Sequence, residues 1–241
     1  MRGLFVTGTG TEVGKTVLAA AICAALAARG RRVAAFKPVV TGLDEPSGDW
    51  PRDHELLARV GSAGQAPDDV APFRFGPPVS PHYAAELAGT TVEPPSLVDA
   101  ARDAGERADL LVCEGVGGLM VPITPGYLVR DLAVDLDLPV LVAARPGLGT
   151  INHSLLTVEA ARAGGLEVAA VVLTPSSADA GGIEGSNRET IASLAGVSVC
   201  TLRETSPDDL AKAGAELPLD DWLGEPGGAE PTAPEGTDAD E

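Results

Sequence analysis

Aromatic side chains are scarce in this sequence, at 3% of 241 residues, although 44% of the residues are hydrophobic. A buried core must therefore be built from alanine, valine and leucine rather than from large rings. No apolar run reaches the roughly 18–20 residues that a membrane-spanning helix requires. An apolar run also follows Met1-Arg2 directly, so we expect no signal peptide, no membrane association and a cytoplasmic location.

Cysteine is also rare, and the thiols of Cys23, Cys113 and Cys200 lie far apart in the chain. Each sits inside an apolar run, which predicts buried structural thiols. Their spacing excludes a disulfide framework or a zinc site. The three histidines form no pattern of a nucleophilic triad with serine or cysteine, and we expect structural hydrogen bonds for His82 and His153.

Basic residues are outnumbered by acidic ones, 17 to 35, which gives a net charge of −18. Such a chain repels polyanions, and this excludes nucleic acid as its main partner. Residues 225–241 contribute six of the acids and no lysine or arginine. We predict a single domain over residues 1–223 and an acidic, Gly/Pro-rich, disordered tail over residues 224–241.

Apolar runs alternate with segments of helical pattern along most of the chain. The expected strands are residues 2–8, 33–37, 109–114, 139–144, 166–173 and 197–202. The expected helices are residues 14–28, 53–60, 82–88, 96–107, 128–136, 149–162, 185–195 and 206–213, with an irregular stretch at 61–81. This alternation predicts an α/β fold with a parallel sheet flanked by helices, of the P-loop NTPase type.

The motif GTGTEVGKT at residues 8–16 joins the first strand to the first helix. Glycines in such a loop let backbone N–H groups surround phosphate oxygens, and the helix directs its positive end at the same anion. Lys15 would add a point charge, and the Thr16 hydroxyl would ligate Mg²⁺. The motif is a variant, because the position of the first expected glycine is occupied by Thr9. It predicts nucleotide binding.

Polar residues follow several of the expected strands, and ligands of parallel sheets bind at the carboxyl ends of the strands. Lys37 and Glu114 end two strands, and Thr41 follows shortly after the first of them. Glu114 could hold Mg²⁺, and Lys37 could supply a second cation to a phosphoryl group or an anionic substrate. Plainer interpretations stay open from position alone: a solvated Lys37, a loop-capping Glu114, and an Asp53 that only caps a helix.

As a set, these residues resemble the dethiobiotin synthetase family. The resemblance spans roughly residues 2–205 and rests on VTGTGTEVGKT at 6–16, FKPVVTG at 36–42, SPH at 80–82, CEGVGG at 113–118 and LGTINH at 148–153. Members are ATP- and Mg²⁺-dependent cyclo-ligases of biotin biosynthesis that insert CO₂ between the two amines of 7,8-diaminononanoate (7,8-diaminopelargonate). A carbamate and a carbamic–phosphoric anhydride are intermediates, and dethiobiotin, ADP and phosphate are the products. The family is homodimeric, with substrate near the subunit interface.

The resemblance also implies residue roles. The catalytic residues would be Lys37, Lys15 and Thr11, and the Mg²⁺ ligands Thr16, Asp53 and Glu114. Substrate would contact Thr41, Thr11, Lys37, Gly149, Thr150 and Asn152. The nucleotide would contact Glu12, Val13, Gly14, Lys15, Thr16, Val17, Asp53, Glu114, Gly115, Val116, Gly117, Thr174, Pro175, Leu202, Arg203 and Glu204.

Two departures from the family pattern concern the base pocket. Thr174 stands where the family often has an asparagine that contacts adenine, and Leu202, Arg203 and Glu204 replace an Ile-Pro stretch. A hydroxyl cannot make the paired donor and acceptor contact of an amide. We therefore expect weakened selectivity for ATP over other nucleoside triphosphates.

Two other classes use related P-loop domains. ATPase switches of the partition or division-site type carry an additional lysine near the start of the loop, and residues 8–14 contain none. Amidotransferases of the cobalamin pathway need a glutaminase domain with a catalytic cysteine and histidine. We expect no such domain, because only a short acidic stretch follows residue 213.

Overall fold

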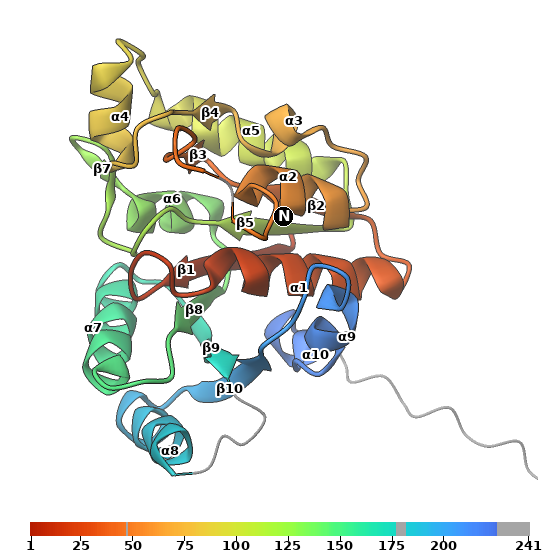
Figure 1. Ribbon diagram of the computed structural model, residues 1–241, viewed down its shortest axis with the longest axis vertical. Helices are drawn as coiled ribbons and strands as arrows, with labels where there is room; N and C mark the ends of the chain where they lie inside the picture. The colour runs from red at the N-terminus through yellow and green to blue at the C-terminus, as the bar shows by residue number, and fades with distance from the viewer. Residues whose placement is uncertain (47, 177–181, 226–241) are drawn as a thin grey trace, which may run out of the picture.

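The computed structural model describes residues 1–46, 48–176 and 182–225 (Figure 1). A six-stranded parallel sheet forms its centre, in the order β10-β9-β8-β1-β5-β2. The strands are β1 (Gly3–Gly8), β2 (Val33–Phe36), β5 (Leu110–Glu114), β8 (Val140–Ala144), β9 (Val168–Ser176) and β10 (Ser198–Arg203). The parallel α/β fold predicted from the alternating pattern is confirmed.

Helices cover both faces of the sheet. One face carries α1 (Lys15–Ala28), α2 (Asp53–Val60), α3 (Pro67–Val70), α9 (Leu210–Ala215) and α10 (Leu219–Trp222). The other carries α4 (Pro81–Leu87), α5 (Pro94–Glu106), α6 (Val129–Leu136), α7 (Thr150–Ala163) and α8 (Ile183–Ala195). Among the described residues, no helix combines the length and the apolar character needed to cross a membrane.

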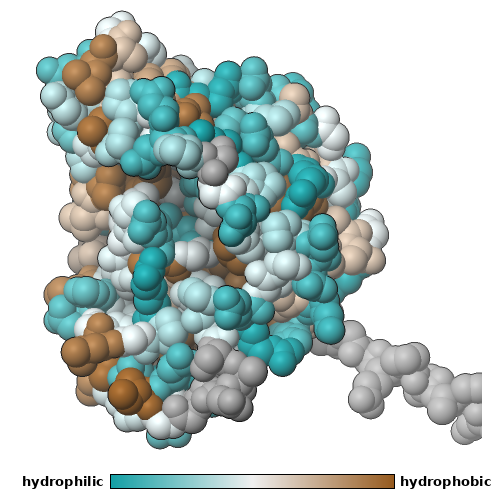
Figure 2. Space-filling model, in the orientation of Figure 1, coloured by the Kyte–Doolittle hydropathy of each residue, from teal (hydrophilic) through white to brown (hydrophobic). Residues whose placement is uncertain are grey.

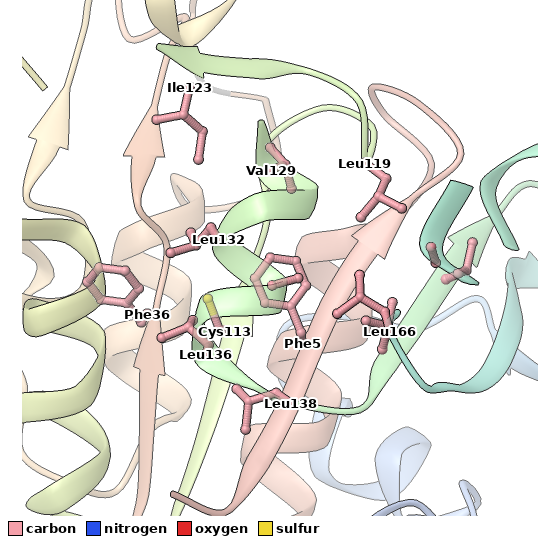
Figure 3. Packing of buried hydrophobic residues seen from close by; sticks show 14 of the residues in the cluster. Phe5, Phe36, Cys113, Leu119, Ile123, Val129, Leu132, Leu136, Leu138 and Leu166 are labelled. Atoms are coloured by element: carbon pink, nitrogen blue, oxygen red, sulfur yellow. The ribbon is translucent and has the colours of Figure 1, made fainter. Parts of the chain in front are cut away.

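The two faces share the apolar strands because successive side chains point in opposite directions. In β1, Leu4 and Val6 pack under α1, whereas Phe5 packs into the opposite layer. Figure 3 shows Phe5 and the ring of Phe36 on this second side, with the leucines of α6 between them. Uninterrupted apolar runs are therefore required for each central strand.

Several short elements were not predicted. The stretch 61–81, expected to be irregular, contains α3 and β4 (Phe73–Arg74), and β4 pairs with β3 (Val39–Val40). A hairpin of β6 (Pro122–Thr124) and β7 (Tyr127–Leu128) and the helix α10 were missed as well. These segments are too short to show a periodic pattern.

The prediction that all three thiols are buried needs one correction. Cys23 and Cys113 are buried as expected, but Cys200 is only half-buried. Its strand, β10, lies at the edge of the sheet and pairs only with β9, so the packing around it is less complete.

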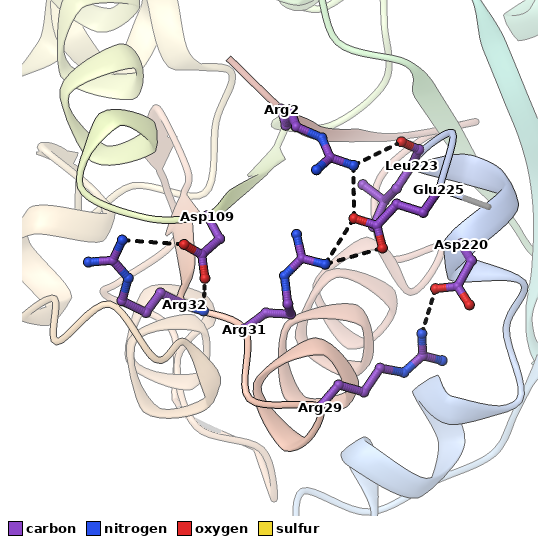
Figure 4. A network of polar contacts seen from close by, with 8 residues as sticks. All are labelled: Arg2, Arg29, Arg31, Arg32, Asp109, Asp220, Leu223 and Glu225. Carbon is purple, nitrogen blue, oxygen red and sulfur yellow. Dashed lines mark hydrogen bonds and ion pairs between the residues drawn. The ribbon is translucent and has the colours of Figure 1, made fainter. Parts of the chain in front are cut away.

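The C-terminal segment packs against the N-terminal region. Glu225 accepts ion pairs from Arg2 at 2.8 Å and Arg31 at 2.9 Å, and Arg29 pairs with Asp220 at 2.8 Å (Figure 4). Defined contacts thus continue to residue 225, two residues past the predicted boundary at 223. The rest of the predicted tail, residues 226–241, lies outside the described residues.

Candidate active site

The order of the strands brings three sequence-distant segments together at the carboxyl ends of neighbouring strands. β1 lies between β5 and β8, and its last residues lead into the glycine-rich loop. Val6 is in register with Glu114, so the carboxylate at the end of β5 lies beside the start of that loop. β2 pairs with β5 on its other side and ends just before Lys37. The predicted meeting of Lys37, Glu114 and the loop is confirmed.

The loop at residues 8–16 has the backbone of a phosphate-binding turn. Glu12 has a φ of 57° and Gly14 a φ of 87°, so two peptides are turned out of the usual regions. A side chain at Gly14 would also collide with Thr174, since a Cβ there would lie 2.8 Å from Thr174 Cγ2. The amides of Val13 and Gly14 have no intramolecular acceptor within the described residues. Such amides are suited to an anion.

Lys37 is at the centre of a buried polar cluster. Its Nζ lies 2.5 Å from Glu114 Oε1 and 2.9 Å from Asp53 Oδ2. The Thr16 hydroxyl donates to the same Glu114 oxygen at 2.8 Å. The Lys37 side chain is 5% exposed and that of Glu114 is fully buried. The predicted metal ligands therefore lie together, with Lys37 among them.

Burial and neighbouring charges shift the pKa values of the cluster. Burial lowers the pKa of Lys15 to about 8, against the opposing effect of Glu114. Burial also lowers the pKa of Lys37, but the carboxylates of Asp53 and Glu114 together outweigh it and raise that pKa above its ordinary value. Burial raises the pKa of Glu114. Lys37 therefore stays charged, and an anion bound beside Lys15 would raise the pKa of Lys15 back toward its ordinary value.

The side chain of Lys15 folds over the loop, and its Nζ donates a hydrogen bond to the Gly10 carbonyl at 2.7 Å. A bound phosphate would compete for this ammonium. The loop, Lys37 and Glu114 surround a cavity of about 400 Å³. It is lined by Thr11, Glu12, Val13, Gly14, Lys15, Thr16, Val17, Lys37, Val39, Thr41, Trp50, Pro51, Asp53, Leu56, Glu114, Val116 and Gly117.

The chemistry of this cavity fits Mg²⁺. Glu114 Oε2 is buried and has no hydrogen-bond partner within the described residues, which leaves one carboxylate oxygen for a ligand. Thr16 and Asp53 supply further hard oxygens beside it. Mg²⁺ is commonly held by one or two carboxylates together with substrate phosphates rather than by an all-protein cage. In the described part of the chain, no group of three or more His, Cys, Asp or Glu side chains is placed to hold a metal ion.

The start of α7 lies at a second cavity, of about 550 Å³, on the other side of the loop. Thr11 lines both cavities. Thr150 lines the second one, and its buried hydroxyl has no partner among the described residues. Gly149 caps α7 with a φ of 92°, and Asn152 is exposed in the first turn of the helix.

The residues expected around the base are more dispersed. Thr174 is buried against Gly14, and Pro175 lines the second cavity. Arg203 and Glu204 line a third cavity of about 370 Å³ beyond β9 and β10. The side chain of Leu202 is buried in the core beneath α1, so only its backbone can face a ligand.

Gly115 also serves the site indirectly. A Cβ at this position would lie 2.7 Å from Val129 Cγ1, so the residue lets α6 pack closely under the loop. Its amide donates to the Val6 carbonyl at 2.9 Å and fixes the end of β5.

Several residues of the site were missed, among them Trp50 and Arg145. Trp50 lines the first cavity from a polar loop that has no periodic pattern. Arg145 donates from Nε at 2.9 Å and from Nη2 at 2.7 Å to the carbonyl of Glu12. Arg145 directly follows β8, so its place at a strand end was a usable signal.

Solved structures of low sequence identity share this fold. A ParA family ATPase from Chlorobium tepidum TLS aligns with a TM-score of 0.51 and 11% identity over 92% of this chain and 91% of its own. Apo McdA from Cyanthece aligns with a TM-score of 0.52 and 10% identity over 88% and 90%. At such identities the likeness concerns the fold alone.

Curated relatives are much more similar in sequence. The ATP-dependent dethiobiotin synthetase BioD of Bacillus subtilis (strain 168) is 37% identical over 83% of this chain and 85% of its own. The protein of the same name from Anaeromyxobacter dehalogenans (strain 2CP-C) is 40% identical over 89% and 95%. A family model described as an AAA domain matches residues 2–202. With the site geometry and these relatives together, the chain belongs to the ATP-dependent dethiobiotin synthetase family.

Proposed function

We propose that the protein is a Mg²⁺-dependent dethiobiotin synthase that uses ATP to convert 7,8-diaminononanoate and CO₂ into dethiobiotin, ADP and phosphate. The observation that carries this proposal is the second buried ammonium, Lys37, which lines the same cavity as the P-loop lysine. Nucleotide hydrolysis alone does not require a second ammonium. A reaction that brings a second anion up to the γ-phosphate does require one, because the two negative charges must be stabilised side by side.

The loop would bind the triphosphate through the amides of Val13 and Gly14 and through Lys15. Release of Lys15 from the Gly10 carbonyl would let its ammonium reach the β- and γ-phosphates. Phosphoryl transfer needs charge stabilisation and in-line positioning more than covalent help. The loop and Lys15 supply both.

Lys37 would act on the carbamate that forms when one substrate amine adds CO₂ and loses a proton. Its charge would hold the carbamate near the γ-phosphate, with hydrogen bonds from Thr41 and Thr11, which line the same cavity. A carbamate oxygen then attacks the γ-phosphorus and ADP leaves. The second amine attacks the carbamate carbon, the five-membered urea ring closes, and phosphate leaves. Lys37 and Lys15 stabilise the negative charge in both transfers.

Thr16, Asp53 and Glu114 would hold Mg²⁺, which neutralises charge on the phosphate oxygens when it is bound. Lys37 forms ion pairs with two of these three residues, Asp53 and Glu114. The same carboxylates thus keep Lys37 charged and in place for the substrate.

We propose further that the substrate carboxylate binds at the start of α7, where Gly149, Thr150 and Asn152 begin a helix whose amides favour an anion.

A homodimer would complete this part of the site. The exposed side chain of Leu148 lines the second cavity. Exposed Met120 and Leu156 line a further cavity, which is also bounded by residues of the P-loop. Figure 2 shows hydrophobic side chains on the side of the molecule that carries α7. Because the reaction consumes ATP, we place it in the cytoplasm.

Phosphate release with ATP, Mg²⁺ and bicarbonate, measured with and without 7,8-diaminononanoate, tests the reaction. We expect release that depends on the diamine, and a product whose mass shows one carbonyl bridging both nitrogens. Release that ignores the diamine would refute the synthase and leave a nucleotide hydrolase. The mass of the native protein by light scattering tests the homodimer, and a monomer would refute it.

A further inference from the structure

Arg145 makes an unusual contact with the P-loop. Its guanidinium donates two hydrogen bonds, from Nε at 2.9 Å and Nη2 at 2.7 Å, to a single backbone atom, the carbonyl oxygen of Glu12. Glu12 has a φ of 57°, a conformation that a residue with a side chain rarely adopts. The side chain of Arg145 therefore holds a loop conformation that the sequence does not favour locally.

The contact has a directional consequence. A trans peptide is planar, so the carbonyl of Glu12 and the N–H of Val13 point in opposite directions. Arg145 binds the carbonyl from the second cavity, and Val13 lines both this cavity and the phosphate-binding one. With the carbonyl held, the amide of Val13 points away from Arg145, and no residue in the described part of the chain accepts from it. The charged donor also polarises the peptide and strengthens that amide as a donor.

The segment that carries Arg145 is itself anchored. Asn187 of α8 donates from Nδ2 to the carbonyl of Pro146 at 2.9 Å. The backbone on the other side of Arg145 belongs to the buried strand β8. The guanidinium is therefore presented from a fixed segment rather than from a free loop.

We propose that Arg145 is a positioning residue: it fixes the Glu12–Val13 peptide so that the Val13 amide faces the phosphates, and thereby sets the affinity for the nucleoside triphosphate. The proposal rests on the proposed function only for its kinetic test. Nucleotide binding can be measured without the diamine, so failure of the synthase assignment and failure of this inference are distinguishable.

The test compares Arg145→Ala, Arg145→Gln and Arg145→Lys with the parent protein. Equilibrium dialysis gives the Kd for a non-hydrolysable ATP analogue with Mg²⁺, and steady-state kinetics give KM and kcat for ATP and for the diamine. Hydrogen bonds from a charged donor are strong enough to predict a roughly 10- to 100-fold weaker Kd in the Ala and Gln variants. Lysine lacks the planar fork, so Arg145→Lys should recover only part of the affinity.

Two controls separate positioning from general damage. Arg162→Ala removes an exposed arginine from the last turn of α7 and should leave the Kd unchanged. Asn187→Ala loosens the anchored segment and should weaken the Kd in the same direction, by less, and non-additively with Arg145→Ala.

Four results would overturn the inference. An unchanged Kd for nucleotide in Arg145→Ala would show that the loop needs no such support. Full recovery in Arg145→Lys would show that charge alone matters. A larger KM for the diamine with an unchanged Kd for nucleotide would make Arg145 a substrate ligand instead. Thermal unfolding is followed for every variant, and a Kd loss that tracks the loss of Tm would reduce Arg145 to a structural residue.

Discussion

Lys37 and Glu114 form a buried ion pair, with 2.5 Å between Nζ and Oε1, in the wall of the first cavity beside the P-loop. Asp53 joins them from the start of α2. Two acids around one base leave a net negative charge, which suits a divalent cation. They also leave Lys37 fully ionised for an anionic substrate.

Replacing Lys37 by methionine should abolish turnover and weaken the fold at once. We expect a fall in kcat of at least about 100-fold, since a charge that stabilises the transferring group is lost. The free energy of unfolding should fall by about 3–5 kcal/mol, because Glu114 is left buried without its partner. The double variant Lys37→Met/Glu114→Gln should regain stability but not turnover. Urea unfolding and phosphate release measure the two effects, with the exposed Arg107→Met as control.

His54 should make the stability depend on pH. Burial lowers the pKa of this imidazole, which is 7% exposed, below its ordinary value of about 6.5. Below that pH the unfolded chain binds a proton that the folded chain does not yet accept, so the free energy of unfolding falls as pH drops. His54→Leu should flatten the fall of the urea midpoint that sets in below the ordinary pKa of about 6.5. His153→Gln, at an exposed position, should retain the slope; identical slopes in all three proteins would exclude His54 as the source.

The cysteines should differ sharply in reactivity. Burial raises the pKa of Cys23 to about 12 and raises that of Cys113 as well, so both remain protonated and inaccessible. Cys200 is half-buried on the edge strand. At neutral pH, a maleimide should label Cys200 in the folded protein and all three thiols in urea. Peptide mass mapping identifies the sites, and fast labelling of Cys23 in the folded state would contradict the packing of α1.

Selectivity among nucleoside triphosphates should be weak. Thr174 replaces the asparagine that often contacts adenine in the family, and it lies against Gly14 of the loop. We expect kcat/KM values for ATP, CTP and GTP within about tenfold of each other, which corresponds to less than about 1.4 kcal/mol of discrimination. Thr174→Asn should shift the preference toward ATP. A strong preference for ATP in the parent protein would refute the prediction.

Removal of the acidic tail should leave catalysis intact. A chain that ends after Glu225 retains the ion pairs to Arg2 and Arg31. One that ends after Gly224 loses them, and the free energy of unfolding should change by less than about 1 kcal/mol, since these pairs are partly exposed. Turnover should be unchanged in both. A large loss of kcat in the longer truncation product would give the tail a catalytic role.

The sequence predicted the larger elements of the fold well, and for a physical reason. Runs such as residues 109–114 and 139–144 are apolar throughout because both faces of β5 and β8 are buried. The helix at Asp53–Val60 was predicted with its observed bounds. Pairs such as β3 with β4 were missed, because two-residue strands are defined by tertiary pairing and have no periodicity of their own.

The site was predictable as a neighbourhood but not as a set of contacts. Strand ends predicted that Lys37 and Glu114 would lie near the P-loop. The strand register brings Lys37 and Glu114 together, and only the side-chain positions show that their charges touch and that Asp53 reaches them from α2. The hydrogen bonds from Arg145 to the Glu12 carbonyl depend on the positive φ of Glu12, and the residue types of the loop do not predict that conformation.

The position of β1 inside the sheet separates two tasks. Lys37, Asp53 and Glu114 come from the β2 and β5 side, whereas Thr174 and Arg203 come from β9 and β10 on the opposite side. If Thr174 and Arg203 contact the base, as the family resemblance implies, substitutions on the β9–β10 half would alter the choice of base at a distance from Lys37, Asp53 and Glu114. A change of nucleotide preference would then need substitutions on one side of the P-loop only, while the groups proposed for carboxylation stay in place on the other side.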